Sequence, residues 1–393
     1  MENNILEKAK RIHLIGIGGT GMSGLAQLLL SMDKKISGSD NNPSIVLEKL
    51  KKKGIQIFCP QREENICKDI ELIIHSHAIL PDNPEYKQAI EYNIPAISYP
   101  EAVGCVMEKK KGIAIAGTHG KTTTSSLIVS VLKTAGCSPS FLIGGEIRNI
   151  GNSEAGKGDL LVVEACEYKR SFLNYRPEIG VVTAIEEDHL DYYRDIEEIK
   201  SAFRDFINNI KGLVIYCADD RNVLDVIKTV DKKIMVSYGL NRGKWKAKNI
   251  KFSKNTSEFE CLFEGKKEAL IKIGLSGIHN IKNALAVIAC ARYLNIPWEG
   301  IKEGLEKFNG VHRRCEILGK SGGITIIDDY GHHPTEIKCT LKCIRNMFPD
   351  NRLIVVFQPH QYSRTRFLLK EFAMSFSDAD KVVVPDIYFV RDS

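Results

Sequence analysis

Residues 112–123 read GIAIAGTHGKTT, and this stretch sets the fold of the region around it. The apolar run predicts a buried strand, residues 121–135 predict a helix, and the glycines between them predict a tight turn. Glycines at such a turn let backbone N–H groups approach phosphate oxygens, and the positive end of the helix dipole adds to the attraction. Lys121 is placed to reach the terminal phosphates and Thr122 to bind Mg²⁺. The stretch therefore predicts a triphosphate site.

The turn is a shortened variant of the P-loop pattern G-x-x-x-x-G-K-[ST], because Gly117 lies only three residues before Gly120. The alternative is an ordinary glycine-rich turn that carries a chance lysine. A strand before the turn and a helix after it favour the phosphate site. The predicted nucleotide-binding residues of this turn are Gly117, Thr118, His119, Gly120, Lys121, Thr122 and Thr123.

Strand and helix patterns alternate on both sides of this turn, which predicts an α/β fold with parallel sheets. We expect three domains, at residues 1–106, 107–311 and 312–393. Residues 245–273 alternate with period two, which predicts a small antiparallel meander inserted in the central domain. The last block shows three strand patterns, few for an independent doubly wound domain. We therefore expect that this domain is small or that the sequence is incomplete at its C-terminus.

Acidic residues follow two apolar strands of the central block. Glu164 ends LLVVE, and the segment EEDH at residues 186–189 follows IGVVTAI. Ligands bind at the carboxyl ends of parallel strands, and Mg²⁺ prefers carboxylate oxygens. A single such residue is more often a solvated loop charge, but two clusters after two buried strands favour a magnesium nucleotide site.

The first block contains a second glycine-rich turn. Gly16, Gly18 and Gly21 follow a strand with the spacing G-x-G-x-x-G, and Asp40 ends the next strand. This is the dinucleotide fingerprint. The motif indicates a backbone that can hold a pyrophosphate at a helix N-terminus. Both NAD and a nucleotide sugar contain a pyrophosphate. The pattern therefore predicts a diphosphate ligand and leaves its identity open.

Two segments of the last block combine polar residues with a position at a strand end. DDYGHH at residues 328–333 follows ITII, and HQYSR at residues 360–364 follows LIVVFQ and a proline. Three histidines, an arginine and two aspartates at adjacent strand ends favour a site, although a lone histidine is more often a packing residue. Arg313 and Arg314 are either a bidentate clamp or surface arginines. Periodicity alone predicts that Asn280 and Asn283 are surface residues.

Composition excludes several classes of protein. With 43% hydrophobic and 26% charged residues among 393, the chain has the material for ordered cores. The net charge of +6 is spread along the sequence, so we expect no nucleic-acid partner. The apolar runs are strand-sized, so we expect no membrane span. Eleven cysteines without a C-x-x-C pair favour free thiols in a reducing cytoplasm over a zinc site.

Taken in order, the motifs resemble those of the Mur ligase family. They are HLIGIGGTGMSGLA, GTHGKTTT, EACE, EEDHLD, GIHNIKNA, GVHRR, DDYGHHPTE and QPHQYSRT, and they span nearly the whole chain. The first motif and DDYGHHPTE are most similar to the branch that adds L-alanine to UDP-N-acetylmuramate. The resemblance implies a Rossmann-like domain for the UDP-sugar, a central ATPase domain and a Rossmann-like C-terminal domain for the amino acid.

The resemblance also implies an activity and a set of site residues. The reaction would join L-alanine to the carboxylate of UDP-N-acetylmuramate through an acyl phosphate, with ATP and Mg²⁺, in peptidoglycan precursor synthesis. The implied catalytic residues are Lys121, Glu164, His189, His332 and Arg364. The implied metal ligands are Thr122, Glu164 and His189, and further nucleotide-binding residues are His279, Asn280, Asn283 and Arg313. The implied substrate-binding residues are Gly18, Gly19, Gly21, Asp40, Arg314 and His360.

Three alternatives remain open at this point. A related ligase that attaches a whole tripeptide to the same UDP-sugar shares most of these motifs. The fingerprint at residues 16–21 also suits an NAD(H)-binding oxidoreductase. The short last block also suits an inactive nucleotide-binding protein. The stretch EACEYK, where the family usually has EADESD, departs from the family pattern.

Overall fold

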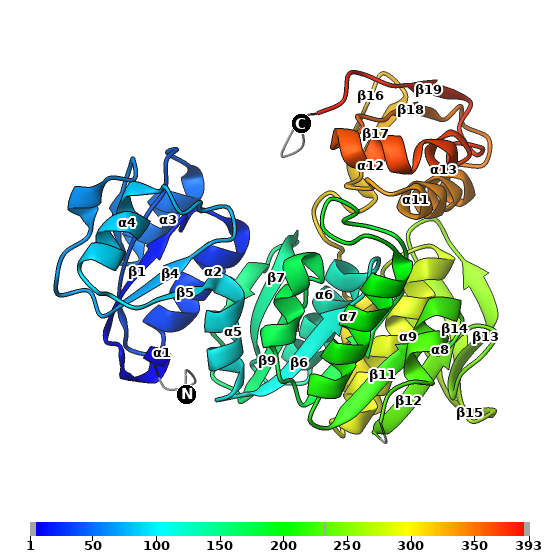
Figure 1. Cartoon of the computed structure of the whole chain (residues 1–393). Coiled ribbons are helices and arrows are strands. Elements are labelled where there is room, and N and C mark those ends of the chain that lie inside the picture. The colour runs from blue at the N-terminus through cyan, green and yellow to red at the C-terminus, as the bar shows by residue number, and fades with distance from the viewer. Residues whose placement is uncertain (1–4, 232, 389–393) are drawn as a thin grey trace.

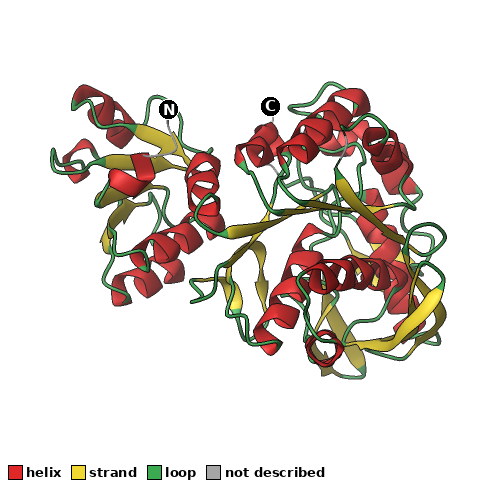
Figure 2. Cartoon of the chain, turned by 90° about the horizontal axis from the view of Figure 1, so that it is seen from below, coloured by secondary structure: helices red, strands yellow, loops and turns green. Residues whose placement is uncertain are grey.

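The computed structural model describes residues 5–231 and 233–388, so residues 1–4, 232 and 389–393 lie outside the described part. The chain forms three α/β blocks that follow one another in the sequence, and the last block lies above the central one (Figure 1). Helices cover both faces of the central sheet (Figure 2). Among the described residues, no helix has the length and apolar character that a membrane crossing requires.

The first block is a five-stranded sheet with the order β3-β2-β1-β4-β5, and all its strand pairs are parallel. Its strands are β1 (Arg11–Ile15), β2 (Lys35–Ser39), β3 (Gln56–Phe58), β4 (Leu72–His75) and β5 (Ala96–Ser98). Its helices are α1 (Ile5–Lys8), α2 (Thr20–Leu30), α3 (Ile45–Lys52), the 3₁₀ helix η1 (Glu63–Asn65), α4 (Pro84–Glu91) and α5 (Tyr99–Met107). Side-chain caps begin two of these helices: Ser44 accepts from the Leu47 N–H, and Asn83 from the Glu85 N–H.

The central block is built on a ten-stranded sheet with the order β15-β14-β13-β12-β11-β10-β6-β9-β7-β8. Its strands are β6 (Lys111–Ala116), β7 (Ser140–Ile147), β8 (Gly151–Glu154), β9 (Leu160–Glu164), β10 (Ile179–Val182), β11 (Leu213–Cys217), β12 (Ile234–Gly239), β13 (Trp245–Phe252), β14 (Ser257–Phe263) and β15 (Lys266–Ile273). Its helices are α6 (Lys121–Thr134), the 3₁₀ helix η2 (Tyr168–Asn174), α7 (Ile196–Asn209), α8 (Arg221–Ile227), α9 (Ile278–Tyr293) and α10 (Trp298–Glu306).

The predicted meander is present, and it extends the sheet instead of forming a separate insert. β13, β14 and β15 pair antiparallel with one another, and β13 also pairs parallel with β12 through Tyr238 and Trp245. At the centre, β6 lies between β9 and β10, and all three run parallel. The turn after β6 therefore opens at the middle of the carboxyl edge, where ligands bind in such sheets.

Helix α6 is buried almost along its whole length because other elements cover it on several sides. It contacts β6, β7 and β9 on one side and α9 and α10 on the other. The Ser130 hydroxyl donates to the Gly304 carbonyl of α10 at 2.8 Å, and a side chain at Gly304 would collide with the Val131 backbone. This burial fixes the N-terminal end of α6, and with it the position of Lys121.

The last block contains β16 (Glu316–Ser321), β17 (Ile324–Asp328), α11 (Pro334–Met347), β18 (Ile354–Val356), α12 (Tyr362–Phe367), α13 (Leu369–Ala373) and β19 (Lys381–Val383). Pro334 stands at the first position of α11, where proline is favoured. The strand arrangement differs from the prediction, because β17 pairs antiparallel with β16 while β18 pairs parallel with β19 in a separate sheet. Gly322 and Gly323 have φ of 54° and 80°, which favours a tight hairpin between β16 and β17.

Candidate active site

The glycine turn after β6 adopts a backbone that requires glycine at both ends. Gly117 has φ of 138°, and a Cβ there would lie 2.0 Å from the Thr183 hydroxyl. Gly120 has φ of 82° and is the N-cap of α6, so the first N–H groups of the helix face the turn. The geometry matches the predicted phosphate cradle.

Lys121 is the first residue of α6, and its ammonium group is held in place by neighbours. Its Nζ lies 2.9 Å from Glu167 Oε1 and also donates to the Gly117 carbonyl. Burial lowers the pKa of Lys121, but the acidic groups around it, Glu167 first among them, together outweigh burial and raise the pKa above its ordinary value. Lys121 is therefore a fixed cation beside the turn.

Thr122 and Glu164 lie together next to Lys121. The Thr122 hydroxyl is 3.1 Å from both carboxylate oxygens of Glu164, and the Gly144 N–H donates to the same carboxylate at 2.9 Å. His189 lies in the loop between β10 and α7, and its Nε2 is 4.0 Å from Glu167 Oε1. Two of the three predicted metal ligands are thus in direct contact, and the third, His189, lies near Glu167, the partner of Lys121.

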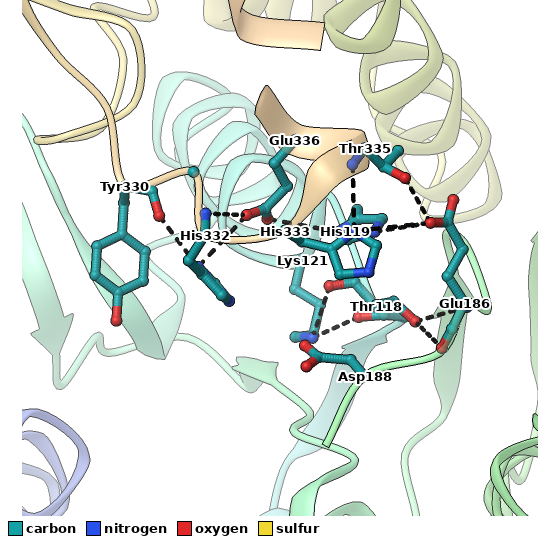
Figure 3. Close-up of polar contacts among 12 residues, drawn as sticks. Thr118, His119, Lys121, Glu186, Asp188, Tyr330, His332, His333, Thr335 and Glu336 are labelled. Carbon is teal, nitrogen blue, oxygen red and sulfur yellow. Dashed lines mark hydrogen bonds and ion pairs between the residues drawn. The ribbon is translucent and has the colours of Figure 1, made fainter. Parts of the chain in front are cut away.

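The last block closes over the turn from above (Figure 3). The His119 ring lies between two carboxylates, with Nε2 3.3 Å from Glu186 and Nδ1 3.4 Å from Glu336. The Thr335 hydroxyl donates to Glu186 at 2.6 Å. Thr335 and Glu336 begin α11, so this network joins the phosphate turn to the last block. Sequence reasoning did not single out either residue, although both stand in the motif DDYGHHPTE.

A second contact between the blocks is a buried ion pair. Arg364 donates from Nε and from Nη2 to one carboxylate oxygen of Asp188, at 3.1 and 2.9 Å. Both side chains are 9% exposed. His333 adds a hydrogen bond, with Nε2 3.1 Å from the Glu187 carbonyl. The predicted catalytic residue Arg364 therefore fastens the last block to the loop that carries His189.

The charged groups of this network stabilise one another. Burial lowers the pKa of His119, but hydrogen bonds to Glu186 and Glu336 outweigh burial and raise it to about 9. Burial raises the pKa of Glu186, and its contacts with His119 lower it to about 2. Burial raises the pKa of Glu336, but its contacts with His119, His332 and Arg314 together outweigh burial and hold the pKa well below its usual value. The imidazolium and both carboxylates are thus charged at neutral pH.

His119, Glu186 and His333 bring three potential metal-ligand atoms within 4.8 Å of one another. Both ring nitrogens of His333 are already engaged, because Nδ1 accepts from the Thr335 N–H at 3.3 Å while Nε2 contacts the Glu187 carbonyl. The Glu186 carboxylate is shared between His119 and Thr335. The cluster is therefore a hydrogen-bonded contact between blocks.

A cavity of about 830 Å³ opens beside the turn, a volume that suits a nucleotide. Its lining includes the turn, the start of α9 and the start of α11. The predicted residues that line it are His119, Gly120, Thr122, Thr123, His279, Asn280, Asn283 and Arg314. The surface position that periodicity predicts for Asn280 and Asn283 is wrong, since each is 8% exposed. Helix α9 is covered by the sheet on one side and faces the cavity on the other, so its polar face is inside the protein.

Burial also acts on His279, which lines this cavity. It lowers the pKa of His279 to about 4, and the charges of Lys282 and Arg314 act in the same direction. His279 is therefore neutral at physiological pH. Arg314 pairs with Glu336 at 3.5 Å, and Arg313 is more exposed, pairing with Asp328 at 3.4 Å. Of the two arginines, only Arg314 lines the cavity among the described residues.

Two predicted residues of the last block lie in different surroundings. His332 is next to the network, with Nδ1 3.1 Å from the Tyr330 carbonyl and 3.4 Å from Glu336. Burial lowers its pKa. His360 stacks on Tyr388 with 5.6 Å between ring centroids, and it is outside the described lining of the large cavity.

The first glycine turn lies in the other block and is held by Asp40. The Gly18 N–H donates to the Asp40 carboxylate at 3.0 Å. A Cβ at Gly18 would lie 2.7 Å from that carboxylate, and one at Gly21 would lie 2.7 Å from the Tyr99 ring. Helix α2, which follows this turn, contacts β7 and β8 of the central block. The turn is thus placed toward the central block but separate from the cavity.

Three matches to known domains follow one another along the chain. Residues 11–111 match the Mur ligase family catalytic domain, residues 115–291 the Mur ligase middle domain, and residues 313–387 the Mur ligase glutamate ligase domain. Together they account for most of the described residues.

Curated relatives match over nearly the whole sequence. The UDP-N-acetylmuramate–L-alanine ligase of Caldanaerobacter subterraneus subsp. tengcongensis is 45% identical, covering 98% of this chain and 85% of its own length. The ligase of the same name from Aquifex aeolicus is 42% identical, covering 97% of this chain and 85% of its own.

Two solved structures have the same architecture. The UDP-N-acetylmuramate-alanine ligase of Thermotoga maritima aligns with a TM-score of 0.83 at 32% identity, covering 96% of this chain and 85% of that one. A murein peptide ligase of Psychrobacter arcticus aligns with a TM-score of 0.77 at 27% identity, covering 95% and 84%. Identity of this degree along the full run of three blocks, together with the shared fold, shows that the chain belongs to the Mur ligase family.

Proposed function

We propose that this protein is an ATP-dependent ligase that joins L-alanine to the carboxylate of UDP-N-acetylmuramate in peptidoglycan precursor synthesis. The observation that carries the proposal is the glycine turn, whose residues His119, Gly120 and Thr122 line a nucleotide-sized cavity. Lys121 follows Gly120 at the start of α6, and Glu164 contacts Thr122. Relatives that bear the name of this activity are 42–45% identical to the chain. The fold, the charged turn and the relatives support the same reaction.

The reaction proceeds in two steps. A muramoyl carboxylate oxygen attacks the γ-phosphorus of ATP, the bond to the β–γ bridging oxygen breaks, and an acyl phosphate and ADP form. The alanine nitrogen then attacks the acyl carbon and loses a proton, and the tetrahedral intermediate releases phosphate. The protein contributes position and charge. Lys121 neutralises developing charge on the phosphates, since its pKa stays above its ordinary value.

The residues present fit a magnesium ion. The Thr122 hydroxyl and the Glu164 carboxylate place hard oxygen ligands 3.1 Å apart beside the phosphate turn. These two residues, with His189, would hold the ion, which supplies charge neutralisation to the phosphates when it is bound.

The first and last blocks have separate roles in this proposal. Gly18, Gly19 and Gly21 form the cradle for the UDP-sugar diphosphate, and Asp40 holds that cradle in shape. The last block presents the incoming amino acid, with Arg364, His332 and Arg314 at the face that covers the turn. All eleven cysteines are free thiols, which suits a reducing compartment, so we place the reaction in the cytoplasm.

The alternatives are separated by the acceptor. ADP release is measured with ATP, Mg²⁺ and UDP-N-acetylmuramate, and either L-alanine or the tripeptide L-alanyl-γ-D-glutamyl-meso-diaminopimelate is added. The proposal predicts ADP release that requires the UDP-sugar and is fastest with L-alanine. Faster turnover with the tripeptide would assign the chain to the recycling activity. Binding of NADH, followed by nicotinamide fluorescence, would instead support an oxidoreductase.

A further inference from the structure

An aromatic cluster lies beside His189, which stands in the loop between β10 and α7. The Tyr168 ring packs on the His189 imidazole, with 4.9 Å between the ring centroids and 42° between the ring planes. Tyr192, from the same loop as His189, meets Tyr168 edge-on at 6.1 Å between centroids. Because Tyr168 begins η2, the ring contact joins the segment after β9 to the loop after β10. One side of the imidazole is therefore covered by a tyrosine.

Hydrogen bonds fix the backbone of His189 in an uncommon conformation. Its φ is +53°, in the left-handed region that few residues with a side chain adopt. The Tyr192 and Tyr193 N–H groups both donate to its carbonyl at 2.9 Å, and its own N–H donates to the Asp188 carboxylate at 2.7 Å. These bonds hold the main chain, whereas the direction of the imidazole depends on what the side chain contacts.

The His189 imidazole faces two acidic residues. Its Nε2 lies 4.0 Å from Glu167 Oε1 and 3.9 Å from Asp188 Oδ2, and both distances are beyond hydrogen-bond range. Lys121 is the close partner of Glu167, and Arg364 is the close partner of Asp188. Neither carboxylate therefore fixes the ring, and the packed tyrosine is placed to do so.

Tyr168 is itself held in place by hydrogen bonds. Its hydroxyl donates to Asp191 Oδ2 at 3.2 Å, and its carbonyl accepts from the Ser171 hydroxyl at 2.8 Å. The carbonyl of the preceding residue, Glu167, accepts from the Tyr193 hydroxyl at 2.6 Å. Tyr193 is 1% exposed, so this anchor belongs to the core. The Tyr168 ring is thus a fixed surface against which the imidazole packs.

We infer that Tyr168 is a positioning residue, which keeps the His189 imidazole in the orientation that binds the metal ion and so raises the affinity of the site for Mg²⁺. The inference rests on the proposed function, because His189 is a metal ligand only in that reaction. A flexible side chain loses rotamer freedom when it binds a metal, whereas a packed ring has already lost it. Packing on Tyr168 therefore lowers the entropy that metal binding costs.

Comparison with the family pattern gives two informative substitutions at this position. Tyr168 is the fifth residue of EACEYK, where the family usually has EADESD, so the ring stands in place of a serine. A serine has no ring that could stack on an imidazole. Tyr168→Ser therefore removes the contact, whereas Tyr168→Phe keeps the ring and loses the hydroxyl that bonds to Asp191.

Nuclear magnetic resonance tests the metal contact without turnover. The histidine rings of the full chain are labelled with ¹³C, His189→Gln identifies the His189 resonance, and Mn²⁺ is titrated in the presence of ADP. Mn²⁺ broadens the resonances of the groups that bind it. We expect the midpoint of this broadening to rise by about tenfold or more in Tyr168→Ser and to stay within about twofold of normal in Tyr168→Phe. An unchanged midpoint in Tyr168→Ser would overturn the inference and leave the proposed metal site intact.

The same resonance tests the packing and the function on which the inference rests. Before Mn²⁺ is added, the ring current of Tyr168 should displace the His189 resonance, so Tyr168→Ser should move it and Tyr168→Phe should move it little. If Mn²⁺ left the His189 resonance of the unchanged chain sharp, His189 would not be a metal ligand. That part of the proposed function would then be wrong together with the inference.

ADP release gives the matching kinetic test. In Tyr168→Ser, the Mg²⁺ concentration for half-maximal ADP release should rise by about tenfold, with kcat at saturating Mg²⁺ close to normal. Tyr192→Ser is the matched control, since Tyr192 is 40% exposed and its ring packs on Tyr168 and Tyr193 in the described part of the chain. It should change neither quantity. A lower kcat in Tyr168→Ser with the Mg²⁺ dependence unchanged would show that Tyr168 only supports the fold, and it would overturn the inference.

Discussion

The two glycine turns of this molecule have the same backbone plan and different chemistry. In each, a parallel strand ends, a glycine is the N-cap, and a helix begins: Gly19 precedes Thr20 in the first block and Gly120 precedes Lys121 in the second. The first turn carries no cation, and its Gly18 N–H is held by Asp40. The second carries Lys121 and is covered by the last block through His119. The comparison teaches that a glycine turn provides a place for phosphate, whereas neighbouring charges decide whether phosphate is only held or also transferred.

Lys121→Thr gives the second turn the residue of the first, and it should have the largest effect. We expect ADP release to fall by about 10³-fold or more, because the fixed charge beside the transferred phosphoryl group is lost. Glu167 loses its partner in this variant, so Lys121→Thr combined with Glu167→Gln serves as a check on folding. Lys133→Ala, on the same helix but paired with Glu154 at the surface, is the matched control. If Lys121→Thr released ADP at a rate within a few-fold of normal, the proposed chemical difference between the two turns would be wrong.

Asp188→Ala removes the ion pair with Arg364 that holds the last block over the second turn, and it leaves the turn itself unchanged. Breaking a buried ion pair costs about 3–5 kcal/mol, so Arg364 should no longer hold the last block in place. We expect a larger radius of gyration in small-angle scattering and ADP release reduced by about 10²-fold. Asp191→Ala, in the same loop but at the surface, should change neither quantity. An unchanged radius of gyration would show that the block is held by other contacts.

Glu164→Gln tests whether the second turn works with a metal ion. The amide keeps a hydrogen bond with Thr122 but loses the charge that favours Mg²⁺. We expect the Mg²⁺ concentration for half-maximal ADP release to rise by about 10–100-fold. Glu154→Gln is the control. The same Mg²⁺ dependence in both variants would remove Glu164 from the proposed metal site.

Gly18→Ala perturbs the first turn, and here the effect should be smallest. The added Cβ lies 2.7 Å from the Asp40 carboxylate, so that side chain must shift. We expect the KM for UDP-N-acetylmuramate to rise by up to about tenfold, with little change of kcat, because this turn binds without reacting. Gly319→Ala is a neutral control, since nothing lies within 4 Å of its Cβ. A drop in kcat alone would mean that the first turn takes part in the chemistry.

Local sequence patterns were enough to predict most elements and the position of the second turn. Apolar runs such as LLVVE, and the proline that begins α11, carry signals within a few residues. The antiparallel pairing of β17 with β16 also has a local signal, the Gly322–Gly323 turn, which differs from the parallel arrangement that the alternating pattern favours. Residues 362–373 form two short helices, because α12 ends at Phe367 and α13 begins at Leu369.

The contacts between blocks could not be predicted from local patterns. His119 meets Glu336, and Asp188 meets Arg364, across separations of more than a hundred residues, and no periodicity reports such pairs. Asn280 and Asn283 were misjudged for a related reason. A polar helix face usually contacts water, but here it faces a cavity whose walls come from the central block and the last block together.

The central claim is that the second turn holds ATP so that its γ-phosphoryl group passes to a carboxylate. Its most direct test uses UDP-N-acetylmuramate labelled with ¹⁸O in the muramoyl carboxylate, with ATP, Mg²⁺ and L-alanine. The account predicts that one ¹⁸O atom appears in the released phosphate for each bond formed, because the attacking oxygen leaves with phosphorus. Unlabelled phosphate, released at the rate of amide formation, would contradict it.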